Sequence, residues 1–286
     1  MRYIVTHPGS AHKDELLACA LLIAKHPVRI VRCVPSAEEL AAANIAVVDI
    51  GHCYQPELLN FDHHQFDRGA EPTCSVSLVL QFLGLYQAAQ RFCKWLPFTE
   101  RLDCCGPQAT ADWLGLNRSQ FAAMNSPLDI GLLSLFGQQT ELCPGDPLFE
   151  IIRSIGTELI NFLKLQSSRI TYLEQHVESW DFAIDDQVRK VLFLAKTPHQ
   201  PERVTAAFFD YIETANLAHN LCALVYPDSR SEGYGLKRFE DTSPIDLSAI
   251  VTEPDVHFVH ASGFLAKTSA CDSVRIRQLL EIALQA

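Results

Sequence analysis

The first 85 residues alternate β-prone runs with helix-forming segments, and this alternation restricts the chain to few folds. Val28–Val34 is rich in β-branched residues, and Ile45–Ile50 is continuously apolar, as in a buried parallel strand. Two further strands are predicted at Arg2–Thr6 and Leu58–Asp62, and helices at Asp14–Lys25, Ala37–Ala43 and Ser75–Leu83. The alternation predicts an α/β fold with a mostly parallel sheet and helices on its faces.

The rest of the chain predicts a helical middle and a second, smaller α/β region. Residues 98–175 are mostly helix-forming, with one long helix over Phe149–Glu178. Strand-like runs follow at Val191–Ala195, Ala206–Tyr211, Leu221–Tyr226 and Val256–His260, before a closing helix at Asp272–Leu284. We therefore predict an N-terminal domain over residues 1–120, a helical connector over 121–185 and a C-terminal α/β domain over 186–286.

Charge and cysteine content limit the classes of function. Lys and Arg number 23 against 34 Asp and Glu, a net charge of −11, which repels a long polyanion and disfavours a tight binder of duplex nucleic acid. Carboxylates that hold cations would account for part of this charge. The ten cysteines form no CxxC pair, and no apolar stretch reaches the ~18 residues of a membrane span. These features predict a cytoplasmic protein with free thiols and no membrane partner.

Histidines and carboxylates follow three of the predicted strands. His7, Asp49 and the segment Asp62-His63-His64 each stand at a strand end, and parallel strands bring such ends to one edge of a sheet. His12 and Asp14 are two residues apart and would point roughly 200° apart on a helix. We therefore expect both in the turn that Pro8-Gly9 begins, before the helix.

These side chains are too many for one tetrahedral ion and suit two octahedral ions that share a carboxylate. A mixed His/Asp set without cysteine favours Mn²⁺, followed by Mg²⁺, Co²⁺ or Zn²⁺. Two divalent cations about 3.5–4 Å apart activate water and stabilise the entering and leaving oxygens of a phosphoryl displacement.

Several motifs resemble one known family. They are Thr6-His7-Pro8-Gly9 with His12 and Asp14-Glu15, Val48-Asp49-Ile50-Gly51, Phe61-Asp62-His63-His64-Gln65 and Phe258-Val259-His260-Ala261-Ser262-Gly263-Phe264. With these motifs the chain resembles the DHH phosphoesterase superfamily and, within it, the melanocyte-proliferating-gene exonuclease family. The resemblance implies a DHH-type catalytic fold for residues 1–120 and a substrate-binding role for residues 186–286.

The resemblance also implies a role for each residue of the N-terminal motifs. His7 and His12 would hold one ion, Asp14 and His63 a second, and Asp49 would bridge the two. His64 would face the substrate phosphate or donate a proton, and Asp62 would orient the histidines. Asp103 is the candidate for a final carboxylate ligand.

Three departures from the family pattern stand out. His12 occupies a position where most of the superfamily has aspartate. His52 replaces a glycine common in the Val-Asp-Ile-Gly loop. Cys104-Cys105-Gly106-Pro107 follows Asp103 in place of an Asp-Asn-Gly pattern.

Five residues near the C-terminus are candidates for substrate binding. His260, Ser262 and Gly263 form a loop of small residues whose backbone N–H groups, with the nearby Lys267, suit a phosphate. Arg238 is the fifth candidate for binding the substrate.

The preferred interpretation is a dimetal-dependent phosphoesterase. The family resemblance implies that it acts as a 3′–5′ exonuclease on short single-stranded RNA or another oligonucleotide. One alternative is a pyrophosphatase or a phosphodiesterase of small nucleotides on the same centre. Another is a metal-binding regulatory protein without turnover, which the altered sequence around Asp103 leaves open.

Overall fold

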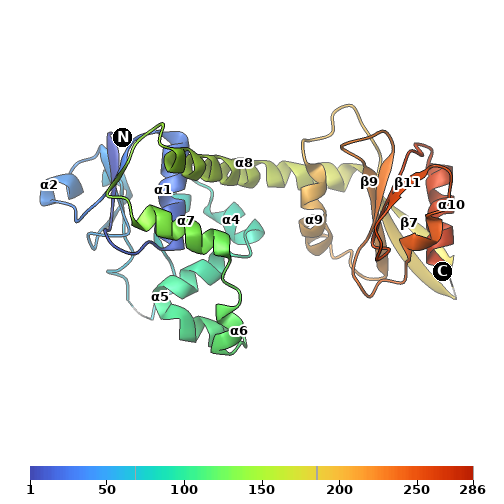
Figure 1. Cartoon of the computed structure of the whole chain (residues 1–286), viewed down its shortest axis with the longest axis horizontal. Coiled ribbons are helices and arrows are strands. Elements are labelled where there is room, and N and C mark those ends of the chain that lie inside the picture. Colours follow the sequence, from blue (N-terminus) through green and yellow to red (C-terminus); the bar gives the residue numbers. More distant parts are fainter. Residues whose placement is uncertain (68, 185, 286) are drawn as a thin grey trace. The chain divides into compact units, whose positions relative to one another are not determined.

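The chain forms two compact units with separate hydrophobic cores. The structure, a computed structural model, describes residues 1–67, 69–184 and 186–285 (Figure 1). The units are Met1–Leu165 and Gln166–Ala286. The division between them falls inside the long helix α8 (Pro147–His176), within the stretch that the sequence predicts as a connector. The boundaries near residues 120 and 185, which separate the connector from the two predicted domains, stay predictions.

The first unit contains a six-stranded sheet with helices around it. Its strands are β1 Tyr3–Thr6, β2 Ile30–Arg32, β3 Ile45–Val48, β4 Tyr54–Gln55, β5 Asn60–Phe61 and β6 Glu141–Leu142. Its helices are α1 Lys13–Lys25, α2 Ala37–Leu40, the 3₁₀ turn η1 Pro56–Leu58, α3 Ser75–Phe82, α4 Tyr86–Phe92, α5 Leu96–Trp113, α6 Arg118–Ala122 and α7 Pro127–Gly137, followed by α8.

The strand order in this sheet is β4-β5-β3-β1-β2-β6. The pairs β1–β2, β1–β3 and β3–β5 are parallel, and the edge strands β4 and β6 are antiparallel to their neighbours. The predicted α/β fold with a mostly parallel sheet is therefore confirmed. The parallel core also puts the carboxyl ends of β1, β3 and β5 on one edge.

Helix α1 is the centre of the first unit. All residues of Asp14–Ile23 are buried, and Leu16–Ile23 is continuously apolar, as expected for a helix surrounded by the core. Helix α8 approaches it so closely at Gly156 that an added Cβ would lie 2.0 Å from the carbonyl oxygen of Ala20. Glycine at this position allows the two helix backbones to touch.

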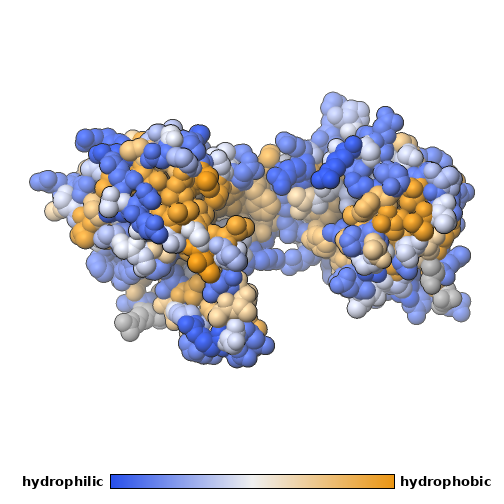
Figure 2. Space-filling model, in the orientation of Figure 1, coloured by the Kyte–Doolittle hydropathy of each residue, from blue (hydrophilic) through white to orange (hydrophobic). Residues whose placement is uncertain are grey.

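Helix α7 is only partly covered by the rest of its unit. Leu128, Ile130 and Leu135 are 83%, 57% and 52% exposed, and apolar residues gather on the surface of the first unit around α7 (Figure 2). Phe136 of the same helix is fully buried. None of the helices among the described residues combines the length and the hydropathy that crossing a bilayer requires.

The second unit is a mixed sheet with helices. After α8 it contains β7 Val177–Ile184, β8 Gln187–Leu194, η2 Val204–Ala207, α9 Phe208–Thr214, β9 Leu221–Pro227, β10 Tyr234–Arg238, η3 Leu247–Ile250, β11 Val256–Val259, β12 Leu265–Thr268 and α10 Ser273–Leu284. The strand order is β11-β12-β10-β9-β8-β7, with only β8–β9 parallel among the described pairs. The predicted α/β character is confirmed.

The strand predicted at Ala206–Tyr211 is wrong, because this segment is helical in η2 and α9. The buried residues Val204, Ala207, Phe208, Tyr211 and Ile212 recur at intervals of three and four, the period of a helix. The helical spacing of the buried residues, rather than the strand-like composition of the run, decided the structure of this segment.

Candidate metal centre

Polar residues follow three neighbouring strands where these strands end. The register places Thr6 beside Val48 and Val48 beside Phe61. The residues that come next along the chain are His7, Asp49 and Asp62. The backbone therefore brings His7, Asp49 and Asp62 to the same edge of the sheet, as the sequence predicts.

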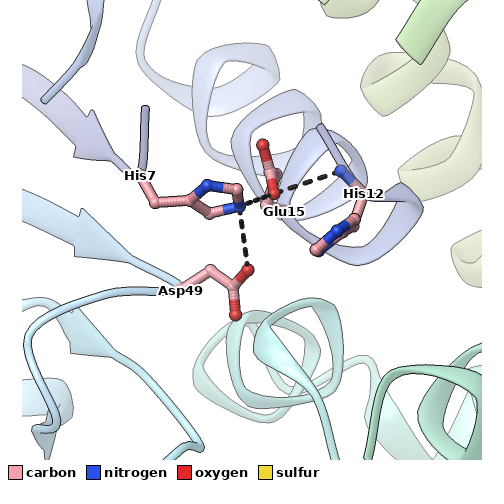
Figure 3. Close-up of side chains that lie close together, drawn as sticks. All are labelled: His7, His12, Glu15 and Asp49. Atoms are coloured by element: carbon pink, nitrogen blue, oxygen red, sulfur yellow. Dashed lines mark hydrogen bonds and ion pairs between the residues drawn. The ribbon is translucent and has the colours of Figure 1, made fainter. Parts of the chain in front are cut away.

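The first group of ligand atoms comes from His7, His12, Glu15 and Asp49, and these atoms all lie within 4.8 Å of one another (Figure 3). His7 Nε2 lies 3.5 Å from Asp49 Oδ2 and also contacts the Glu15 carboxylate. The rings of His7 and His12 are 5.5 Å apart between centroids. His12 is exposed, so solvent reaches this group at His12.

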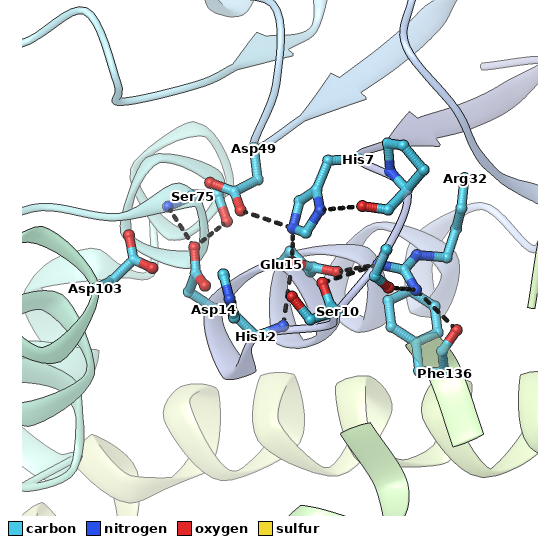
Figure 4. Close-up of polar contacts among 12 residues, drawn as sticks. His7, Ser10, His12, Asp14, Glu15, Arg32, Asp49, Ser75, Asp103 and Phe136 are labelled. Atoms are coloured by element: carbon cyan, nitrogen blue, oxygen red, sulfur yellow. Dashed lines mark hydrogen bonds and ion pairs between the residues drawn. The ribbon is translucent and has the colours of Figure 1, made fainter. Parts of the chain in front are cut away.

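Glu15 is a buried member of this group that the sequence pattern did not assign to the site. Its Oε1 accepts a hydrogen bond of 2.8 Å from Arg32, and its Oε2 accepts one of 3.2 Å from the backbone N–H of His12. Arg32 also donates to the carbonyl oxygens of Gly9 and Phe136, which fixes the turn before α1 (Figure 4). The only sequence signal was the Asp14-Glu15 pair, which helix capping already explained.

The hydrogen bond with Glu15 raises the pKa of His7 to about 9, against the opposing effect of burial. The other ring nitrogen of His7, Nδ1, lies 2.9 Å from the carbonyl oxygen of Pro8, the kind of partner that orients a ligating histidine. Glu15 instead contacts Nε2, the nitrogen that faces Asp49, so it can offer an oxygen of its own to a shared cation.

The second group comes from Asp14, Asp49, His63 and Asp103, again within 4.8 Å of one another. His63 Nε2 lies 3.2 Å from Asp49 Oδ1 and 2.7 Å from Asp103 Oδ2. The two groups share Asp49, with Oδ2 on the side of His7 and Oδ1 on the side of His63. Asp49 adopts a left-handed backbone conformation, with φ of 59°, which a non-glycine residue rarely adopts without a local cause.

The expectation that His12 and Asp14 both lie in the turn before the helix is wrong for Asp14. His12 is the N-cap of α1, and Asp14 lies in its first turn. The two side chains accordingly take part in different groups, with Asp49 common to both. Ser75, at the start of α3, donates to Asp14 Oδ2 through its hydroxyl at 2.7 Å and through its backbone N–H at 3.3 Å (Figure 4).

The second group has the properties of a cation site. Asp49 Oδ1, His63 Nε2 and Asp103 Oδ2 are buried, and none of them has a well-oriented hydrogen-bond partner among the described residues. Buried polar atoms are almost always satisfied, so three such atoms at short distances indicate a shared partner of another kind. Carboxylate and imidazole donors suit a divalent cation of the Mn²⁺ or Zn²⁺ type.

The charges in the second group also favour a bound cation. Burial and the nearby carboxylates of Asp49 and Asp103 raise the pKa of Asp14 to about 8. Burial opposes protonation of His63, but the adjacent carboxylates of Asp103 and Asp49 outweigh it and raise the pKa of His63 to about 12. Three carboxylates this close together are stabilised by positive charge.

His63 has a second contact through its other ring nitrogen. Cys104 Sγ lies 3.8 Å from His63 Nδ1 and donates a hydrogen bond of 2.8 Å to the carbonyl oxygen of Thr73. Asp103 and Cys104 are consecutive residues of α5, so this helix reaches both nitrogens of one imidazole. Helix α5 is kinked at Gly106, two residues after Cys104, where φ is 76°.

Asp62 holds the loop that carries His64. It is fully buried, and its Oδ1 pairs with His64 Nδ1 at 2.6 Å while its Oδ2 accepts from the backbone N–H of His52 at 2.6 Å. Burial would raise the pKa of Asp62, but the hydrogen bonds from His64 and His52 lower it. His52 has a φ of 51°, which explains why a glycine suits this position in the family pattern.

A cavity of about 540 Å³ opens beside the first group. Its polar lining includes His7, His12, Asp49, His52, Asp62 and His64. Its apolar lining consists of Val34, Pro35, Leu40 and Ile50. A ligand in this cavity would therefore meet both candidate ligand residues and apolar side chains.

The five predicted substrate-binding residues all belong to the second unit. His260 Nδ1 lies 2.8 Å from the hydroxyl of Ser262, and the backbone N–H of Gly263 donates to His260 O at 2.8 Å, so the loop is a tight turn. Lys267 Nζ is bonded to both carboxylate oxygens of Asp228, each at 2.9 Å. Arg238 lies 3.8 Å from the exposed Asp241. The assignment of these residues to a substrate stays a prediction.

Comparison with known proteins finds relatives for the N-terminal segment. Residues 3–79 match the family model MYG1_exonuc, described as an uncharacterised protein family (UPF0160). The MYG1 exonuclease of Bos taurus is 47% identical over 64 residues, which cover 22% of this chain and 16% of that protein. That of Homo sapiens is 45% identical over 64 residues, covering 22% and 17%. A MYG1 protein of Chlamydia pneumoniae is 36% identical over 83 residues, covering 29% and 28%.

These matches span less than a third of the length of the relatives. Over residues 3–79 they confirm the resemblance to the MYG1 exonuclease family that the motifs predicted. A solved DHH domain, described as a member of a family of ribosomal proteins, aligns over 100% of this chain and 87% of its own, with a TM-score of 0.35 and 12% identity.

Proposed function

We propose that this chain is a dimetal-dependent phosphoesterase that hydrolyses phosphodiester bonds, as a 3′–5′ exonuclease on short RNA or other oligonucleotides. The observation that carries the proposal is the position of Asp49, whose two carboxylate oxygens face different histidines in two ligand groups. A carboxylate shared in this way is what a pair of cations requires.

His7, His12 and Asp49 would hold one cation, and Asp14, Asp49, His63 and Asp103 the other. When bound, two cations, with Mn²⁺ preferred, would supply activation of water and neutralisation of charge on the phosphate oxygens. The carboxylates and the imidazoles hold these positions before a substrate arrives, because Arg32, Glu15 and Ser75 restrain them.

His64 would act on the substrate rather than on a cation. Its side chain is 49% exposed and lines the cavity, while its Nδ1 is held by the buried Asp62. An imidazole fixed at one nitrogen by a carboxylate can donate from the other to a phosphate or to the leaving oxygen.

The cavity supports an ester over pyrophosphate as the substrate. Pyrophosphate has no organic group, whereas a nucleotide unit could contact the apolar lining residues Val34, Pro35, Leu40 and Ile50. The net charge of −11 favours short strands over long duplexes. The second unit would bind the substrate through His260, Ser262, Gly263, Lys267 and Arg238, and a cytoplasmic location would suit the ten free cysteines.

The test is hydrolysis by the purified chain with Mn²⁺. We expect mononucleotides to be released from the 3′ end of a labelled single-stranded RNA oligomer, and the His63→Ala variant to lose this activity. Asp112→Ala, an exposed carboxylate of α5 outside the ligand groups, is the matched control and should leave the rate unchanged. His64→Ala should lose hydrolysis but keep its cations.

Other results of the same assay would reject the proposal. Phosphate release from pyrophosphate with an intact oligomer would identify the pyrophosphatase alternative. Equal rates for wild type and His63→Ala on every phosphoester would leave only a regulatory, metal-binding protein.

A further inference from the structure

Cys104 contacts His63 at the ring nitrogen that faces away from the ligand group. Its sulfur lies 3.8 Å from His63 Nδ1, whereas His63 Nε2 faces the carboxylates of Asp49 and Asp103 at 3.2 and 2.7 Å. The same sulfur is 2.8 Å from the carbonyl oxygen of Thr73, which can only accept a hydrogen bond. The thiol hydrogen is therefore directed to Thr73.

This arrangement determines which ring nitrogen of His63 keeps its proton when the imidazole is neutral, as it must be to bind a cation. A thiol whose hydrogen is committed to a carbonyl can only accept from a neighbouring group, so His63 Nδ1 must be the donor. The other nitrogen of the neutral ring, Nε2, then presents its lone pair. That atom is one of the three buried atoms of the second group without a well-oriented hydrogen-bond partner among the described residues.

We infer that Cys104 is a positioning residue for the candidate metal centre, which holds His63 in the tautomer whose Nε2 can bind a cation. The inference rests on the proposed function, because it assumes that the second ligand group binds a divalent ion. Residues behind ligating histidines are usually carboxylates, carbonyls or waters, and here a thiol takes that place. Cys104, the first residue after Asp103 where the chain departs from the family pattern, would thus position His63.

Cys105 is the natural control for Cys104. It is the next residue in the chain and is also exposed, and it takes no part in the ligand groups found among the described residues. A general effect of altering this part of α5 would appear in both variants, whereas an effect through His63 would appear only at Cys104.

The experiment measures Mn²⁺ binding by calorimetry in the purified full chain, independently of hydrolysis. We expect Cys104→Val to weaken binding by about 10- to 100-fold, the range found when groups behind metal ligands are removed. Cys104→Ser should recover most of the affinity, because a hydroxyl also donates and accepts. Cys105→Val should bind as wild type does.

A second readout follows the imidazole itself. In ¹H–¹⁵N spectra of the Zn²⁺-loaded chain, we expect a protected Nδ1–H resonance of His63 in wild type and in Cys104→Ser. In Cys104→Val this proton should exchange rapidly with water. Circular dichroism of all variants verifies that α5 and the rest of the fold are intact.

The outcomes separate this inference from the proposed function. Equal Mn²⁺ affinity in Cys104→Val and wild type, or equal weakening in Cys105→Val, would overturn the role of Cys104 even if the oligomer is hydrolysed. Weakened binding in Cys104→Val alone, together with loss of the protected Nδ1–H resonance of His63, would support it even if no phosphoester is cleaved. Weakened binding with that resonance retained would overturn it, because Cys104, which lies near His63 and Asp103, would then act as a ligand itself. A wild-type chain that binds no Mn²⁺ would overturn both.

Discussion

Asp49 is the residue that joins the two ligand groups, because it contributes one oxygen to each. Its position follows from β3, whose last residue pairs with the last residue of β1, and from the left-handed turn at Asp49 itself. His7 lies near its Oδ2 and His63 near its Oδ1. Losing Asp49 therefore affects both groups, whereas losing His12 affects one.

The first prediction concerns the ion content of variants at this residue. We expect Asp49→Ala to lose both cations and His12→Ala to lose only one, because His12 belongs to the first group alone. Metal analysis of protein purified without chelator, in the presence of Mn²⁺, measures the stoichiometry. Asp112→Ala should match wild type. Two ions retained by Asp49→Ala would refute the shared role of this carboxylate.

The second prediction concerns Asp228 in the second unit. Burial would raise its pKa, but hydrogen bonds from Ser231 and Lys267 lower it from 3.8 to about 2. A carboxyl whose pKa is lowered by folding stabilises the protein above about pH 4, and this contribution is lost as the pH falls towards 2.

At pH 7 we expect Asp228→Asn to lower the free energy of unfolding by about 1 kcal/mol, since a partly exposed ion pair is screened by solvent. The difference from wild type should shrink between pH 4 and pH 2, as urea denaturation at several pH values would measure. Asp181→Asn, an exposed residue of β7, is the control. A constant difference over this pH range would contradict the ionic role of Asp228.

Helices α1 and α8 show how an element can be placed by a single glycine. At Gly156 the backbone of α8 meets the carbonyl of Ala20 in α1, and a side chain would have no room there. Gly131 in α7 is also helical, but nothing lies within 4 Å of the position of its Cβ. A side chain is therefore sterically excluded at Gly156, whereas there is room for one at Gly131.

The third prediction compares alanine at these two positions. Gly156→Ala should lower the free energy of unfolding by about 1–3 kcal/mol or more, because the backbone of α1 must shift. Gly131→Ala should raise it by about 0.5–1 kcal/mol, because alanine is the better helix former. Chemical denaturation of both variants measures the difference. Equal stabilisation by the two substitutions would show that α1 and α8 do not touch at Gly156.

At the scale of the whole molecule, the chain has two compact units, each with its own main core, and one candidate metal centre among its described residues. All the ligand residues belong to Met1–Leu165, while the core around Trp180 and Phe193 belongs to Gln166–Ala286. A ligand that binds only the folded form of one unit stabilises that unit.

The fourth prediction is that thermal unfolding has two transitions and that Mn²⁺ shifts one of them. At about 100 times its dissociation constant the cation should add ~2.7 kcal/mol, or about 5–10 °C, to the first unit. Differential scanning calorimetry with and without Mn²⁺ measures both transitions. Ca²⁺, a larger ion that prefers oxygen donors, serves as the comparison. A single transition, or an equal shift of both, would contradict independent units.

The sequence by itself determined the parallel α/β sheet, the strand ends that carry His7, Asp49 and His63, and the resemblance to the MYG1 exonucleases. These follow from local patterns, since apolar runs define the strands and parallel strands share an edge. Contacts between distant segments were decided only by the tertiary structure. Arg32 meets Glu15 across 17 residues, and Cys104 meets His63 across 41, and no local pattern encodes such a pairing. The same holds for Asp103, whose approach to His63 depends on how α5 packs against α1.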